Sequence, residues 1–487
     1  MRRHNFGGRL FDISLTGDAL IRKPFTLRAV QQSTGGESIP MLKRIFCFTA
    51  LFAVMVPGVY ADLQNVEVGG SIRIRGNYYN FDSLGDMSWI EQRTRLNVKA
   101  DFTRDVSAFI EFDYYSGWGD DFRSDYLSGA DTRSGGDDNV HLYQAYVEAR
   151  NLWGSPLSAR VGRQELSFGT EWLVGVNNAA AVFTGLSFDA LRLTWSNDTF
   201  SLDAVAAKAA ESYGDFGDED TDFYALYFSY TGIEDITLDA YWMYLRDASP
   251  TLAADTYMPA EELDLHTVGL RAAGVIGGFD FDVEAAYQFG DVTGLPSACP
   301  YGFGEADVEY DVFAVNSEIG YTFETAWSPR PFARFAYFGG GDTDYLKGFS
   351  NDRNLPFNRL FSNWEYTEFF ANTDESNLLY YALGIGAVPT EAVSLQLVCA
   401  YFEVDENVPS VGWWLGKPDS DRQVGLEVGL YGDYQYSEDL VIRAGYAHFF
   451  GRKGLEQNFF ILNGLDAWGG EEDDDYDYVF LETELAF

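Results

Sequence analysis

The sequence is poor in histidine, proline and long apolar runs, and each shortage narrows the classes of protein to consider. It has 4 histidines and 14 prolines among 487 residues. His141, His266 and His448 stand outside any HExxH, GxSxG or CxxC motif, so no common hydrolase signature is present. A barrel enzyme assembled from distant loops and a soluble acidic adhesin stay open as alternatives. After Ala61 no apolar run approaches the roughly 18 residues of a spanning helix, which excludes a helical membrane protein.

Cysteine and positive charge are also scarce. Nothing in the positions of Cys299 and Cys399 indicates that they pair. Acidic residues number 75 against 33 basic ones, for a net charge of −42, which excludes nucleic acid as a natural partner. Acidic clusters at Asp215–Asp222 and Glu471–Asp477 are typical either of solvated loops or of sites where divalent cations bridge lipopolysaccharide. Because neither has EF-hand spacing, we predict no metal site and no cofactor.

Aromatic residues and glycine are abundant instead. Phe, Tyr and Trp make up 17% of the chain and glycine contributes 49 residues, a composition typical of strands, turns and the aromatic belts of membrane barrels. The stretch Tyr476–Phe487 alternates apolar and polar side chains, which predicts a strand with two different faces. Val479, Leu481, Leu485 and Phe487 share one row. A last strand ending on Phe is typical of the strand that closes an outer-membrane barrel, because lipid tolerates no open edge.

The first residues carry a secretion pattern. A basic pair and the apolar run Ile45–Val56 follow Met41, and small residues precede the expected cleavage point. We therefore expect a signal peptide over residues 41–61 and a barrel over residues 62–487. Residues 1–40 are interpreted as the product of an upstream start codon chosen in error, with a genuine N-terminal extension as the alternative.

The same alternation recurs along the rest of the chain. Strands are predicted at 66–79, 90–102, 106–115, 140–150, 157–168, 188–196, 200–208, 223–230, 236–246, 265–275, 279–289, 312–323, 331–338, 378–388, 392–403, 424–436, 440–450 and 477–487. Short turns alternate throughout with long loops, the largest near 339–376. We predict an all-β fold, a transmembrane antiparallel up-and-down β-barrel of about 18 strands with short periplasmic turns and long extracellular loops. A soluble sandwich lacks this rhythm.

Several stretches resemble the alginate export porin family of bacterial outer-membrane barrels. They are Leu142–Arg150 (LYQAYVEAR), Arg160–Gly169 (RVGRQELSFG), Phe279–Gly290 (FDFDVEAAYQFG), Phe357–Phe361 (FNRLF) and Val424–Phe450. They follow the family's order and span most of residues 62–487. The resemblance implies an outer-membrane channel that exports an anionic polysaccharide such as alginate through a lumen rich in arginine. Because many relatives are porins of unknown cargo, a general diffusion porin is the alternative.

The polar row of each strand predicts the residues that line the pore. These residues are Arg73, Arg75, Arg93, Arg95, Lys99, Glu148, Arg150, Arg160, Arg163, Glu165, Arg192, Arg271, Asp280, Asp282, Glu284, Arg334, Glu427 and Arg443. All polar rows together are slightly acidic, which departs from a purely basic lumen and puts alginate as cargo in doubt. The strand at 279–289 carries the carboxylates Asp280, Asp282 and Glu284, whereas the polar rows of the first two strands are mainly basic. Opposed charged walls would orient a polar solute, whereas cross-strand pairing would neutralise them.

The first two predicted strands carry a basic ladder on the lumen side. Its members are Arg73, Arg75, Arg93, Arg95 and Lys99. Like charges on adjacent strands repel, and only Glu67 and Asp101 are close enough in these strands to neutralise them. Unless a loop folds in, the ladder is therefore predicted to be incompletely paired and to form a wall that attracts anions.

The alternation slips after Gly162. A β-bulge at this point would turn Arg163 and Glu165 into the lumen. Without a bulge both side chains would lie at the membrane rim, where a charge costs little. The glycine favours the bulge, and both residues are counted as pore-lining for that reason.

Together these features predict a channel rather than an enzyme, located in the bacterial outer membrane. Its expected partners are outer-membrane lipid, lipopolysaccharide, the barrel assembly machinery and a polar or anionic saccharide solute. Cargo identity, direction of transport, oligomeric state and any plugging of the pore by a loop do not follow from the sequence.

Overall fold

The computed structural model describes residues 63–81, 85–119, 140–176, 185–211, 220–248, 251–252, 258–259, 262–296, 305–341, 354–362, 366–367, 376–406, 421–454 and 475–487. The predicted signal peptide, Cys299 and most of both acidic clusters lie outside these residues, so the expectations placed on them stay predictions. Cys399 carries a free, exposed thiol. Within the same residues no helix is long and apolar enough to cross a membrane.

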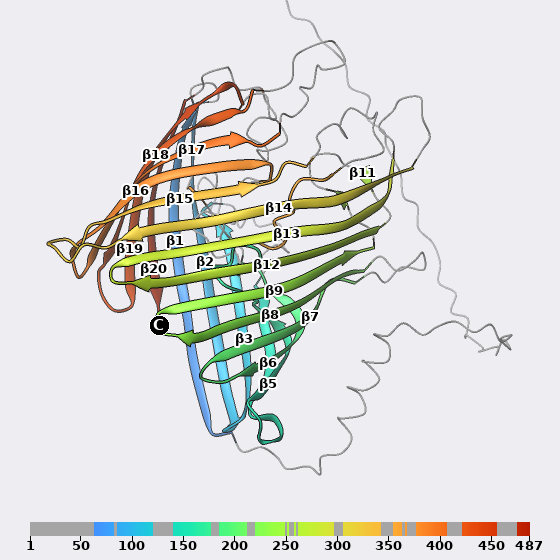
Figure 1. Cartoon of the computed structure of the whole chain (residues 1–487). Helices are drawn as coiled ribbons and strands as arrows, with labels where there is room; N and C mark the ends of the chain where they lie inside the picture. The colour runs from blue at the N-terminus through green and yellow to red at the C-terminus, as the bar shows by residue number, and fades with distance from the viewer. Residues whose placement is uncertain are drawn as a thin grey trace, which may run out of the picture. The chain divides into compact units, whose positions relative to one another are not determined.

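In this part of the chain an 18-stranded antiparallel sheet closes on itself (Figure 1). Its strands are β1 (Asn65–Phe81), β2 (Gly85–Thr103), β3 (Val106–Gly117), β4 (His141–Ala149), β5 (Leu157–Gln164), β6 (Phe188–Ser196), β7 (Phe200–Ala210), β8 (Thr221–Ile233), β9 (Ile236–Asp247), β12 (Glu262–Ile276), β13 (Phe279–Pro296), β14 (Glu305–Tyr321), β15 (Arg330–Phe338), β16 (Leu378–Thr390), β17 (Val393–Val404), β18 (Gln423–Gln435), β19 (Leu440–Gly451) and β20 (Asp475–Ala486). β10 (Thr251–Leu252) and β11 (Met258–Pro259) form a separate pair, and η1 (Leu152–Gly154) is a short 3-10 turn. Strands β1 and β20 pair with each other, which removes both edges. The predicted barrel is confirmed.

Most connections are short at one end of the barrel, the turn end, and long at the other, the loop end. The first hairpin breaks the expected rhythm. Strands β1 and β2 pair without interruption from Asn65–Asp101 to Phe81–Gly85, so the connection between them is shorter than the gap of residues 80–89 that the predicted strand bounds leave. The strands continue because Tyr79 and Trp89 stack across them, with ring centroids 5.4 Å apart, and such aromatic cross-strand pairs stabilise a sheet.

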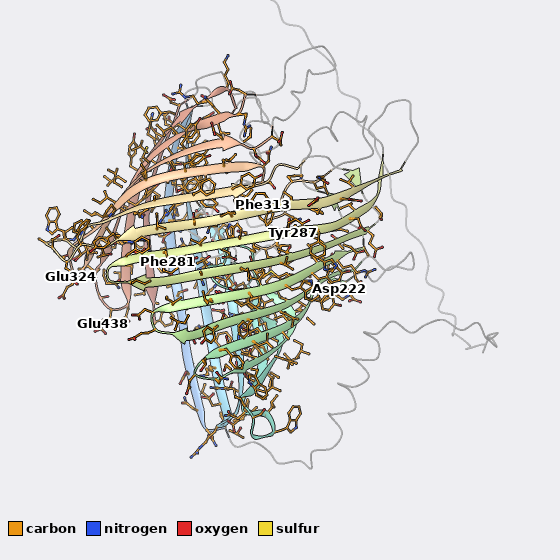
Figure 2. All side chains as sticks on the ribbon, viewed as in Figure 1. Asp222, Phe281, Tyr287, Phe313, Glu324 and Glu438 are labelled. Atoms are coloured by element: carbon orange, nitrogen blue, oxygen red, sulfur yellow. The ribbon has the colours of Figure 1, made fainter. Side chains whose placement is uncertain are left out.

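The outward face of the barrel is apolar. Val68 is 63% exposed and Leu383 is 69% exposed, values that indicate a surface covered by lipid rather than water. In Figure 2, Phe281 lies toward the turn end, and Tyr287 and Phe313 lie toward the loop end. The Tyr287 hydroxyl donates to Asp311 at 2.6 Å. Aromatic side chains near both ends are the pattern of the two interfacial belts of a membrane protein.

A row of charged side chains crosses β5 to β9 on the outward face, at the loop end. Its members are directly opposed from strand to strand: Arg163, Asp189, Lys208, Asp222 and Arg246. Their signs alternate, and the ion pairs measure 2.8 Å between Arg163 and Asp189 and 2.9 Å between Lys208 and Asp222. Figure 2 places Asp222 toward the loop end. Because charges on the outer face cost little only near the interface, this row marks the loop-end limit of the apolar surface.

Two loop-end segments fold back into the barrel. Residues 165–176 and 354–362 meet in a parallel bridge between Val174 and Phe361, where the Phe361 amide donates to Leu173 at 2.9 Å. Trp172 and Phe357 are 0% exposed and their rings stack with centroids 6.1 Å apart. An apolar core therefore occupies part of the lumen beside the charged wall.

Candidate pore lining

The charged part of the lumen centres on Glu482, in the strand that closes the barrel. Its carboxylate accepts hydrogen bonds from Arg73 at 2.8 Å, Arg75 at 3.2 Å and Arg443 at 2.8 Å. Glu484 provides Arg443 with a second partner at 2.6 Å. Glu482 and Arg75 are both fully buried. A carboxylate that accepts from three guanidinium groups is the kind of strong, charge-assisted network that low-dielectric surroundings require.

The rest of the basic ladder also has acidic neighbours. Arg95 donates to Asp113 at 3.0 Å and lies over the ring of Tyr143 at 3.9 Å. Lys99, at the turn end, lies 3.8 Å from Glu67 and 4.0 Å from Asp101. Pairing of the ladder is more complete than Glu67 and Asp101 alone would provide, because Glu482, Asp113 and the inserted Glu165 also contact it. Glu482 reaches the ladder only through the seam between β1 and β20.

Two cations of the basic ladder still lie directly opposite each other. Arg73 and Arg93 are directly opposed on β1 and β2, and both are buried, at 5% and 4% exposure. Opposed cations in a dry wall repel unless acidic groups surround them. This pair keeps two buried cations side by side in the basic ladder.

The predicted lining residues of β4 to β7 form cross-strand pairs. Glu148 accepts from Arg160 at 2.6 Å and lies 3.1 Å from Arg150, which is at the turn-end mouth. Arg192 pairs with Asp203 at 2.8 Å. These contacts neutralise the cations locally.

Two of the three carboxylates of β13, Asp280 and Asp282, are likewise neutralised by arginine. Asp282 pairs with Arg271 at 2.5 Å, and Asp280 with Arg330. Glu284 accepts from the Tyr241 hydroxyl at 2.9 Å. The remaining predicted lining residues lie beside this wall: Arg334 pairs with Glu318 at 2.5 Å, and Glu427 accepts from Tyr431 at 3.1 Å. The charges of this wall are mostly paired between neighbouring strands. The arrangement therefore supports the cross-strand pairing hypothesis rather than a strong field between opposed walls.

Arg163 and Glu165 separate at the end of β5. Strand β5 pairs with β4 in a regular register through Arg163, so Arg163 stays in the outward row and pairs with Asp189 at 2.8 Å. The predicted bulge at this point is wrong. Gly162 is required here because its φ of 125° lies in the region that favours glycine, and a Cβ there would lie 2.3 Å from the Ala145 carbonyl oxygen.

The bulge is in β4 instead. The register shifts between Glu111 and Phe112 of β3. Glu111 pairs with Gln144 and Phe112 pairs with Leu142, so Tyr143 of β4 is an extra residue. This places both Tyr143 and Gln144 on the buried inner side, at 7% exposure each. A bulge re-aims a side chain in this way. The alternation slip at Gly162 did not indicate this bulge, which is in a different strand.

Glu165 lies inside the barrel because β5 ends at Gln164 and the chain turns inward. It accepts from the Tyr143 hydroxyl at 2.7 Å and pairs with Arg95 at 3.4 Å. Burial raises the pKa of the Glu165 carboxyl, and the hydrogen bond from Tyr143 and the charge of Arg95 offset only part of that effect. Glu165 thus joins the inserted segment 165–176 to the basic ladder.

The second inserted segment, residues 354–362, is held by hydrogen bonds to β13. The Gln288 side chain donates to the Asn358 carbonyl at 2.6 Å and accepts from its amide at 2.7 Å. The Trp172 indole donates to the Tyr366 hydroxyl at 3.1 Å, and that hydroxyl bonds to Asn316 at 3.1 Å. Sequence alternation missed these contacts because they join loop residues, which have no period, to strand residues.

No group of three or more His, Cys, Asp or Glu side chains in the described ranges is arranged to hold a metal ion. The carboxylates of the lumen bind arginine and tyrosine instead. The arrangement therefore provides a polar, hydrogen-bonding surface in an enclosed passage.

Comparison with known proteins identifies the family. The alginate export family matches residues 64–451. The chain belongs to this family. No curated protein matches the chain significantly. Among solved structures, it is similar to Pseudomonas aeruginosa OccK8 (OprE), with 15% identity, a TM-score of 0.52 and coverage of 86% of this chain and 98% of that one. It is also similar to Pseudomonas aeruginosa OccK10 (OpdN), with 12% identity, a TM-score of 0.51 and coverage of 86% and 99%. Acinetobacter baumannii OccAB1 has 12% identity, a TM-score of 0.50 and coverage of 86% and 97%. At these identities the likeness shows the fold alone, and it extends over nearly the whole of each solved chain.

Proposed function

We propose that this member of the alginate export family is a channel of the bacterial outer membrane that passes polar solutes, saccharides in particular. The observation that carries the proposal is the contrast between the two faces of the barrel. The inner wall presents ionised, amide and hydroxyl groups, whereas the outer wall presents exposed apolar side chains to lipid. The turn end then faces the periplasm, and the loop end faces the outside.

Family membership supports a narrower cargo, an anionic polysaccharide such as alginate. The basic ladder favours anions, because Arg73 and Arg93 oppose each other there. The cross-strand pairs on β4 to β7 and on β13 favour a less selective passage, because they cancel most of the remaining charge. A general diffusion porin is therefore the second candidate, with cargo chosen by size and polarity.

The proposed activity is transport without catalysis. The buried carboxylates Glu427 and Glu284 each accept a hydrogen bond from a tyrosine, and Asp113 pairs with Arg95. The proposed partners are lipid, lipopolysaccharide and the barrel assembly machinery, together with the saccharide solute itself. The apolar outer wall and its charged loop-end row fit the first two of these partners.

Planar-bilayer recording with the purified protein tests the proposal. We expect discrete conductance steps, a reversal potential that reports weak ion selectivity, and concentration-dependent current block by oligouronates. Neutral oligosaccharides of equal length serve as the matched probe. Block by oligouronate alone would favour the anionic cargo, whereas equal block by both would favour the general porin. Protein that inserts as a barrel yet conducts no ions would overturn the channel function.

A further inference from the structure

Tyr431 in β18 lies flat on the inner wall of the barrel, near the turn end. Two glycines make room for its ring. A Cβ on Gly429 would lie 2.3 Å from the Tyr431 hydroxyl oxygen, and a Cβ on Gly445 of β19 would lie 2.6 Å from the ring. The ring of Phe480 continues the same surface, with centroids 6.4 Å apart and planes at 27°. Tyr431 therefore turns one face to the wall, and its half-buried state leaves the other side toward the lumen.

A cavity of about 360 Å³ opens beside this ring. Its lining includes Tyr431 together with Arg330, Ser394, Gln396 and Asp433, which come from β15, β17 and β18. Gly386 of β16 also lines it. This volume lies within the range of roughly 300–1,000 Å³ that small-molecule sites occupy.

The polar groups of the cavity are compensated rather than cationic. Arg330 is held by Asp280 and by Glu318, the latter at 2.6 Å. Ser394 donates to Asp433 at 3.2 Å, and Gln396 supplies an amide that both donates and accepts. A phosphate or free carboxylate would meet more negative than positive charge here. Hydroxyl groups, which donate and accept alike, match this set better.

We propose that this cavity is a saccharide subsite in which the ring of Tyr431 stacks on the apolar face of a pyranose. Arg330, Gln396 and the Ser394–Asp433 pair then bind hydroxyl groups at the edge of the sugar. The proposal rests on the proposed saccharide channel and adds a recognition point at the periplasmic mouth. The subsite would recognise the sugar ring and not its charge, so its specificity is separate from that of the basic ladder.

A second lumenal cavity lacks an aromatic ring among its described lining residues. That cavity, of about 230 Å³, is lined by Glu148, Arg160 and Arg192 together with small side chains. Its ionised groups are bound to each other or to Asp203. It offers polar contact without a stacking surface.

Current block by maltohexaose, a neutral probe, tests the subsite in the intact channel. Tyr431→Ala is expected to raise the half-blocking concentration roughly tenfold, which corresponds to about 1.4 kcal/mol. Tyr431→Phe keeps the ring and is expected to stay within about twofold of the unmodified channel. Ion conductance in the absence of sugar should be retained in both variants.

Gln396→Ala is the second variant, because it removes a polar group without disturbing the ring. We expect it to raise the half-blocking concentration about threefold, even if Tyr431→Ala fails to insert. Block by maltohexaose that neither variant weakens would overturn the subsite while leaving the saccharide channel intact. A channel that no saccharide blocks would overturn the proposed cargo and the subsite with it.

Discussion

Arg75 and Glu482 are 407 residues apart in the chain, and their side chains form a fully buried ion pair of 3.2 Å inside the barrel. The pair exists because β20 closes on β1, with Arg75 directly opposite Glu482 in the register. Arg73 and Arg443 bind the same carboxylate from the two neighbouring strands. Closure of the barrel therefore also sets the charge of this part of the lumen, because pairing of β1 with β20 brings Glu482 to the arginines of the basic ladder.

Glu482→Gln should destabilise the barrel and make the lumen more cationic. Three arginines lose a shared anion, and breaking a buried pair typically costs about 3–5 kcal/mol. The expected results are a lower midpoint for heat-induced loss of the folded band on gels and a reversal potential shifted toward anion preference. Glu438→Gln is the matched control, because Glu438 lies exposed in a turn (Figure 2). Equal midpoints and equal reversal potentials in the two variants would show that the Glu482 network contributes neither to stability nor to selectivity.

Changing Arg93 and Arg95 together to Gln should shift the reversal potential toward cation preference. The substitution removes two positive charges and leaves Asp113 and Glu165 without the Arg95 guanidinium. The double change to Lys retains the charge and is expected to keep the original selectivity. A reversal potential that stays unchanged in the Gln variant, with conductance intact, would mean that the basic ladder does not set selectivity.

Trp172→Ala should open the lumen. Trp172 is 0% exposed where the inserted segments meet, and truncating a buried aromatic costs about 3–5 kcal/mol of packing. Single-channel conductance is expected to rise as the segments loosen. Trp153→Ala is the control, since Trp153 is 83% exposed in η1. Unchanged conductance in a folded Trp172→Ala barrel would show that the inserted core does not limit the passage.

Arg163→Gln should leave ion selectivity unchanged, although this residue was predicted to line the pore. Its side chain lies on the outward face and pairs with the exposed Asp189, an interaction of roughly 0–1 kcal/mol. Arg160→Gln, three residues earlier on the lumen side, is expected to shift the reversal potential toward cation preference. Comparable shifts in the two variants would contradict the outward placement of Arg163.

Gly70→Ala should impair closure of the barrel. Gly70 exchanges two backbone hydrogen bonds with Phe487, of 2.9 and 3.0 Å. A Cβ on Gly70 would lie 2.4 Å from the Arg95 carbonyl oxygen and 2.9 Å from the Phe487 ring, and overpacking of this kind costs about 1–3 kcal/mol. Gly76→Ala on the same strand is the control, since its nearest neighbour would be 3.8 Å away. The folded fraction on unheated gels measures both, and equal fractions would argue against a tight seam at Gly70.

The sequence alone determined the strands and the face on which most side chains lie. Alternation is a property of adjacent residues, because consecutive side chains of a strand point to opposite faces. The positions of Arg73, Arg75 and Val68 could therefore be predicted without knowing any contact. The family was also recognisable, because its motifs are contiguous.

Only the tertiary structure decided which charges meet and what fills the lumen. Glu482 reaches Arg73 and Arg75 through closure, which depends on the register of strands at opposite ends of the chain. The bulge at Tyr143 is set by the pairing of β3 with β4 and leaves little trace in the alternation of either strand. The inserted Trp172 comes from a loop without periodicity, so its burial depends on long-range packing that the local pattern of residues does not encode.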